Sequence, residues 1–222
     1  MWLNLLFPLF GALAGILLGW VLALRNYKFL KILLTFSGAF LLGIAITHLL
    51  PAAYAENPES TAYWVLGGLV LQLVLESWTK GAEHGHRHHE MNSFPVLLWL
   101  GLCLHALLEG LPLHFYPELK WGMLIHKIPV SLVLYLLLFQ EGSSRTAHVL
   151  LLGIFALMTP IGGLLPTLLT PLQVYAPEMT ALVTGVLLHI STTIIFESNS
   201  NHKLQFQKLL GLLLGFLIAL II

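Results

Sequence analysis

Eight apolar stretches, each about as long as a membrane-spanning helix, follow one another along the chain with short connections. They cover residues 2–24, 31–54, 62–79, 95–115, 121–140, 147–168, 177–196 and 206–222. A helix that crosses the hydrocarbon core of a bilayer needs about 20 mostly apolar residues. The composition agrees, because 58% of the 222 residues are hydrophobic and 9% are charged, which is unlike a soluble domain of this size. The sequence predicts an all-α integral membrane protein in which residues 1–222 form one transmembrane domain.

Lysine and arginine residues lie mainly on one side of these eight predicted spans. Most of the ten lie in or beside the first, third, fifth and seventh connections, namely Arg25, Lys28, Lys31, Lys80, Arg87, Arg145, Lys203 and Lys208. The even-numbered connections contain only Lys120, and Lys127 falls inside a span. Because cytoplasmic loops are enriched in basic residues, the odd-numbered connections are predicted to be cytoplasmic and both termini to be outside. We expect a multi-pass protein of the cell membrane, of the kind found in bacterial inner membranes.

Two other features of the composition exclude classes of function. The formal net charge is zero, so no basic surface indicates binding to nucleic acid. Cys103 is the only cysteine, which excludes a disulfide or a cysteine-based metal finger within one chain. The lipid bilayer is therefore the expected environment of the protein.

Seven histidine, glutamate and lysine side chains lie three or more residues inside the ends of the predicted spans: His48, Glu76, His105, Glu109, His126, Lys127 and His189. A charge at the centre of a spanning helix costs about 2.5–3.5 kcal/mol on insertion scales. Ionisable residues inside spans are therefore few and commonly mark a functional site. These seven residues are the candidates for such a site.

His105 and Glu109 are four residues apart in the fourth span, so they share one face of a helix. At about 1.5 Å rise per residue, Glu109 and His126 of the fifth span fall at a similar depth on the same side of the bilayer centre. Two imidazoles and one carboxylate suit Zn²⁺ and also accept Fe²⁺, Mn²⁺ or Cd²⁺. The pattern predicts a metal site at these three residues. The alternative is a His–Glu hydrogen bond that joins two helices.

A proline follows each half of the predicted site. Pro112 comes three residues after Glu109, and Pro129 comes three residues after His126. A proline inside a helix frees the carbonyl oxygen four residues earlier. Broken helices with free carbonyls are a recurring way to build an ion site in a transporter, so both positions favour an ion site over ordinary packing.

The connection over residues 80–94 contains the run "KGAEHGHRHHE". Its histidines, His84, His86, His88 and His89, are predicted to be auxiliary metal-binding residues in a cytoplasmic loop. The alternative is a polar tether without a specific ligand.

Three further residues are weaker candidates for a transport pathway. His48 lies in the outer third of the second span, where the alternative is a helix-capping hydrogen bond. Glu76 lies near the inner end of the third span, where a side chain usually extends to the interface. His189 lies in the seventh span beside serine and threonine residues, which favours a hydrogen bond to a neighbouring helix.

These motifs resemble the ZIP (Zrt-, Irt-like) family of divalent metal transporters over nearly the whole chain. The fourth span contains "HALLEG", the fifth "HKIPV", the second "HLLP" and the sixth "TPIGGLL". The resemblance implies eight spans with both termini outside, a central metal site between the fourth and fifth helices, import toward the cytoplasm, and homodimers. It also implies that the transported substrate is a divalent metal ion, with Zn²⁺ expected first.

The chain departs from the family pattern at the second metal of the binuclear site. Apolar or neutral residues, Ala106, Val130 and Thr159, stand where ligands are expected, and Lys127 stands beside His126. We expect a mononuclear site in which the ammonium of Lys127 fills the space of the second metal and pairs with Glu109. The alternative is that Lys127 extends to the membrane interface.

Two other functions would also use histidine and glutamate side chains inside a membrane. An intramembrane zinc-dependent hydrolase would also use two histidines and a glutamate around Zn²⁺, but the chain lacks an H-E-x-x-H motif. A haem-binding electron carrier would use pairs of histidines as axial ligands, and the carboxylate at 109 argues against it. We therefore expect a transporter and not an enzyme.

Overall fold

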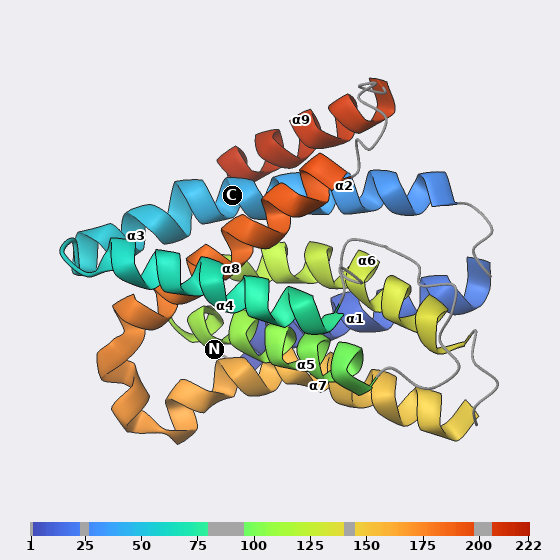
Figure 1. Ribbon diagram of the computed structural model, residues 1–222, viewed down its shortest axis with the longest axis horizontal. Helices are drawn as coiled ribbons and strands as arrows, with labels where there is room; N and C mark the ends of the chain where they lie inside the picture. The colour runs from blue at the N-terminus through green and yellow to red at the C-terminus, as the bar shows by residue number, and fades with distance from the viewer. Residues whose placement is uncertain (1, 23–26, 80–95, 140–144, 198–205) are drawn as a thin grey trace.

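The computed structural model of the chain describes residues 2–22, 27–79, 96–139, 145–197 and 206–222 (Figure 1). Its longer helices are α1 (Trp2–Leu22), α2 (Tyr27–Ile44), α4 (Thr61–Thr79), α5 (Val96–Gly110), α6 (Leu119–Leu138), α7 (Arg145–Leu168), α8 (Ala176–Glu197) and α9 (Phe206–Ile221). Shorter segments are the π-helix η1 (Ala45–Leu49), α3 (Leu50–Glu56), and the 3₁₀-helices η3 (Leu111–His114) and η4 (Thr170–Tyr175). The described residues contain no strand, and the predicted all-α class is confirmed.

Six helical segments of the described chain are long and apolar enough to cross a membrane. They are Leu3–Val21, Phe29–Glu56, Val96–His114, Leu119–Leu138, Arg145–Leu168 and Thr170–Phe196. Helix α9 is a shorter apolar helix, and α4 contains Gln72 and Glu76 within its 19 residues. Each of the eight predicted stretches contains helix, while the count of eight spans stays a prediction.

The helices pack in four close pairs: α1 with α6, α5 with α7, α2 with α9, and α4 with α8. Figure 1 shows α2, η1 and α3 as one continuous helical run with α9 lying along its first part. Helix α2 also contacts α6 and α8, and α4 contacts α5, so these packings join the pairs into one bundle. The helices on either side of the predicted metal site, α5 and α6, are thus each held by a different partner.

Glycine allows the close approach of α5 to α7. A Cβ atom added at Gly162 would overlap the carbonyl oxygen of Leu107, and one added at Gly110 would overlap that of Thr159. Small residues are the usual means by which membrane helices bring their backbones together. The α5–α7 contact therefore fixes the end of α5 that carries Glu109.

The two prolines near the site affect their helices differently. Helix α5 ends at Gly110, and Pro112 lies in the 3₁₀ turn η3 that follows. Helix α6 runs without a break through Pro129, from Leu119 to Leu138. The expectation of a broken helix is thus wrong for α6. A proline removes one backbone donor, and the other hydrogen bonds of a long packed helix are enough to keep it continuous.

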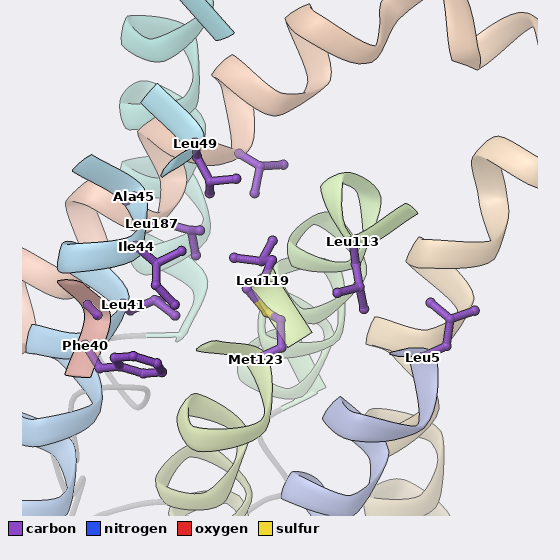
Figure 2. Packing of buried hydrophobic residues seen from close by; sticks show 12 residues of the cluster. Leu5, Phe40, Leu41, Ile44, Ala45, Leu49, Leu113, Leu119, Met123 and Leu187 are labelled. Carbon is purple, nitrogen blue, oxygen red and sulfur yellow. The ribbon is translucent and has the colours of Figure 1, made fainter. Parts of the chain in front are cut away.

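Two apolar clusters lie along the α5–α6 region. The first contains Leu5, Phe40, Leu41, Ile44, Leu113, Leu119 and Met123 among its buried members. Figure 2 shows Leu119 and Met123 of α6 between the α2 side chains and Leu113. The second contains Leu98, Leu102, Cys103, Ala106, Val130, Leu134 and Phe155 among its members. In the first cluster, Leu113 follows Glu109 in the sequence, and Leu119 and Met123 precede His126. In the second cluster, the α5 residues precede Glu109 and the α6 residues follow His126.

Candidate metal centre

Helix α5 brings His105 and Glu109 together, one turn apart. The Nε2 atom of His105 lies 2.9 Å from Oε1 of Glu109, as expected for residues four apart on one helical face. The two side chains are 1% and 0% exposed. A carboxylate removed from water in this way needs polar or charged partners.

Helix α6 adds a second imidazole to the same oxygen. The Nε2 atom of His126 lies 3.2 Å from Oε1 of Glu109, and its side chain is fully buried. The two imidazole rings are nearly perpendicular, with centroids 6.2 Å apart. One ligand atom from each of His105, Glu109 and His126 lies within 4.8 Å of the others. Among the described residues, these form the one group of three His, Cys, Asp or Glu side chains able to hold a metal ion.

Ser37 of α2 contacts the far side of the His126 ring. Its Oγ lies 3.2 Å from Nδ1 of His126, and Ser37 is fully buried. A hydrogen bond at one ring nitrogen orients the imidazole and directs the other nitrogen to its ligand. Sequence reasoning missed Ser37, since serine is common in membrane helices and its spacing from His126 carries no pattern.

The ammonium of Lys127 is paired with Oε2 of Glu109, inside the bundle. The Lys127 side chain is 2% exposed, so it does not extend to the membrane interface. Its Nζ also lies 5.3 Å from the ring centroid of Phe155, a favourable position for a cation over an aromatic face. The two oxygens of the Glu109 carboxylate therefore have different partners. Oε1 faces the imidazoles and Oε2 faces the lysine.

The positions where a second metal's ligands were expected carry packing residues. Ala106 and Val130 are buried members of the second apolar cluster. The hydroxyl of Thr159 donates to the carbonyl oxygen of Ala106 at 2.9 Å, which joins α7 to α5. These three residues bring no imidazole or carboxylate to the site.

The other predicted residues do not join this group. His48 lies in the π-helix η1, with its Nδ1 2.7 Å from Oγ1 of Thr47. Glu76 of α4 and His189 of α8 lie side by side, with Oε2 and Nε2 2.5 Å apart, and so form a polar contact between two helices. The four loop histidines, His84, His86, His88 and His89, lie outside the described residues.

Comparison with known families shows which family the chain belongs to. The family model described as ZIP Zinc transporter matches residues 79–222. The chain belongs to the ZIP zinc transporter family. The matched range contains all three members of the buried His/Glu group and Lys127. No curated protein matches the chain.

ZIP membership confirms the family predicted from the motifs and fits a multi-pass membrane protein that transports divalent metal ions. It is also consistent with a transporter rather than the intramembrane hydrolase. In this ZIP protein, the buried His/Glu group is the described feature whose chemistry suits a divalent metal.

Proposed function

We propose that this ZIP protein imports Zn²⁺ through one metal site formed by His105, Glu109 and His126. The observation that carries the proposal is the convergence of three ligand atoms within 4.8 Å in a fully buried location. The site lies between α5 and α6, the fourth and fifth of the predicted spans. Zn²⁺ enters as the transported substrate.

The donor set supports Zn²⁺ as the first substrate. Two imidazole nitrogens and one carboxylate oxygen are common Zn²⁺ ligands, and three protein ligands leave a fourth position for water. Ligand atoms around a tetrahedral Zn²⁺ lie about 3.4 Å apart, given metal–ligand bonds of about 2.1 Å. Oε1 of Glu109 lies 2.9 and 3.2 Å from the two imidazole nitrogens, and all three ligand atoms lie within 4.8 Å of one another, so this spacing needs only adjustment of the side chains. Cd²⁺, Fe²⁺ and Mn²⁺ are the secondary candidates.

A mononuclear site is part of the proposal. The ammonium of Lys127 is a fixed positive charge on Glu109, and it takes the place of a second divalent ion. Ala106 and Val130 supply no ligand for that ion. The surrogate charge also weakens Zn²⁺ affinity, since like charges a few ångströms apart repel in a medium of low dielectric.

Transport requires the apolar clusters to open in turn. The site residues are buried, with residues of one apolar cluster on each side of them along α5 and α6. A metal ion reaches Glu109 only when one cluster separates, and leaves when the other does. Opening of one side at a time around a fixed site is the general scheme of secondary transporters.

The proposed orientation has eight spans, both termini outside and substrate moving toward the cytoplasm. The bias of lysine and arginine to the odd-numbered connections supports it. The loop over residues 80–94 is then cytoplasmic, and its four histidines act as an auxiliary metal-binding segment. His48, Glu76 and His189 are assigned secondary roles along the pathway. The protein is proposed to be a homodimer in the cell membrane, as in a bacterial inner membrane.

Uptake by proteoliposomes tests this function. Purified protein would be reconstituted and uptake of Zn²⁺, Cd²⁺, Fe²⁺ and Mn²⁺ compared with that of protein-free vesicles. We expect Zn²⁺ uptake by the wild type and background uptake by Glu109→Ala. Equal uptake by the wild type and the variant would exclude the proposed site, and no uptake of any ion by the wild type would exclude the function.

A further inference from the structure

The two oxygens of Glu109 have different partners. Oε1 lies 2.9 Å from Nε2 of His105 and 3.2 Å from Nε2 of His126. Oε2 accepts from the ammonium of Lys127. A carboxylate that keeps this arrangement offers a metal one oxygen and not two.

The lysine has little freedom to leave its oxygen. Its side chain is 2% exposed, and Phe155 lies beneath its ammonium. Phe155 is itself 1% exposed and belongs to the second apolar cluster. A buried ammonium that moved away from Glu109 would enter an apolar region, where an unpaired charge is strongly disfavoured.

We propose that Lys127 remains on Oε2 while the metal is bound and thereby determines which cations the site accepts. This inference rests on the proposed function of the same site. With Oε2 occupied, the protein supplies two nitrogens and a single oxygen. The charges of Glu109 and Lys127 also cancel, so attraction between the protein and a divalent ion comes mainly from metal–imidazole bonding.

Divalent cations differ in how well two nitrogens and a single oxygen suit their ligand preferences. Zn²⁺ is satisfied by four ligands and binds imidazole well. Mn²⁺, Mg²⁺ and Ca²⁺ favour carboxylate, carbonyl and water oxygens, and Ca²⁺ takes six to eight of them, often from bidentate carboxylates. A one-oxygen Glu109 beside a fixed ammonium therefore excludes the oxygen-seeking cations more strongly than Zn²⁺.

The test compares the affinities of Zn²⁺ and Mn²⁺ for purified protein by equilibrium dialysis. Lys127→Met keeps most of the side-chain volume and frees Oε2. We expect the Mn²⁺ affinity to rise about tenfold or more relative to that of Zn²⁺, within the range typical of changes beside a metal ligand. Lys120→Met is the matched control, because Lys120 lies on the same helix against Phe7 and Trp121. Its ratio of Mn²⁺ to Zn²⁺ affinity should equal that of the wild type.

A second variant separates the occupied oxygen from the lost charge. The amide of Lys127→Gln can still donate to Oε2 but carries no charge. We expect both affinities to rise in this variant, with a ratio close to that of the wild type. If Lys127→Gln shifts the ratio as much as Lys127→Met, or if Lys127→Met raises both affinities equally, the occupied oxygen does not set the selectivity and the inference is wrong.

A third readout needs no variant, so it stands even if Lys127→Met fails to fold. Co²⁺ bound to the wild type would be examined by visible absorption. A one-oxygen Glu109 with two imidazoles and water gives the intense bands of four-coordinate Co²⁺. The weak bands of a six-coordinate ion would overturn the inference. Absence of Zn²⁺ and Co²⁺ binding by the wild type would instead contradict the proposed function itself.

Discussion

His126 and Glu109 meet at 3.2 Å across two helices whose closest backbone packing is with other helices. Helix α5 packs mainly against α7, and α6 mainly against α1. The two residues therefore contact each other through long side chains that reach between α5 and α6. A site built in this way depends on the contacts that hold each of the two helices in place.

Ser37→Ala should weaken Zn²⁺ binding although Ser37 is not a proposed ligand. The loss of the contact to Nδ1 leaves the His126 ring free to rotate away from Glu109. Changes at residues that orient a metal-bound histidine typically reduce affinity by about 10- to 100-fold. Equilibrium dialysis with Zn²⁺ measures the change.

Thr35→Val is the matched control for this prediction. The hydroxyl of Thr35 donates to the carbonyl oxygen of Lys31 within α2, at 2.8 Å. Its removal should leave Zn²⁺ affinity unchanged. Wild-type affinity in Ser37→Ala would show that the α2 contact does not position the imidazole.

Gly162→Ala should destabilise the protein by separating α7 from α5. The added Cβ overlaps the carbonyl oxygen of Leu107, and overpacking of this kind costs about 1–3 kcal/mol. Thermal unfolding in detergent would show a lower transition temperature and, because α5 carries two of the three proposed ligands, weaker Zn²⁺ binding.

Gly153→Ala on the same helix is the control, because a Cβ at Gly153 meets no atom within 4 Å. Its effect should be neutral or stabilising by up to about 1 kcal/mol, from the higher helix propensity of alanine. Equal destabilisation by the two alanines would argue against the close α5–α7 contact.

His189→Leu should reduce stability but leave equilibrium Zn²⁺ affinity intact. His189 and Glu76 are 18% and 24% exposed and join α8 to α4 away from the His105–Glu109–His126 group. Interhelical hydrogen bonds in membranes contribute about 1 kcal/mol. Unchanged affinity with a slower uptake rate would place the pair on the transport pathway, whereas a loss of affinity would contradict the separation of the two sites.

Labelling tests the proposed orientation. In a Cys103→Ala background, a membrane-impermeant maleimide should reach His86→Cys only from the cytoplasmic face. Glu59→Cys, at an exposed position in the α3–α4 connection, should be labelled from outside intact cells. Labelling of His86→Cys in intact cells would reverse the orientation and with it the direction of transport.

The sequence predicts the helical class and the convergence of His105, Glu109 and His126 better than it predicts the contacts that support these side chains. His105 and Glu109 follow from a spacing of four residues on one helix, and His126 follows from an estimate of depth. Both rules depend on local helix geometry, and the structure brings the three side chains together. The contact of Ser37 with His126 joins residues 89 positions apart, and no local period encodes it.

The irregular parts of the helices were less predictable for a related reason. A proline rule treats Pro112 and Pro129 alike, but α5 ends near the first and α6 continues through the second. The π-helix at Ala45–Leu49 likewise has no signature in the order of apolar residues.

The pairing of Lys127 with Glu109 was one of two alternatives, because a lysine near a helix end can also extend to the interface. Length and depth alone did not decide between them. The direction of the side chain is settled by its neighbours, with Glu109 attracting the ammonium and Phe155 facing it. Tertiary packing therefore determines the direction of the Lys127 side chain, which the sequence alone does not.

The proposed binding of one Zn²⁺ per chain by His105, Glu109 and His126 is tested by Zn²⁺ stoichiometry and affinity in the wild type and in Glu109→Ala. Both proteins would carry serine at the four loop histidines, His84, His86, His88 and His89, so that only central binding is measured. We predict one Zn²⁺ per chain in the first protein and none in the second. Two Zn²⁺ per chain, or undiminished affinity without Glu109, would contradict the mononuclear site.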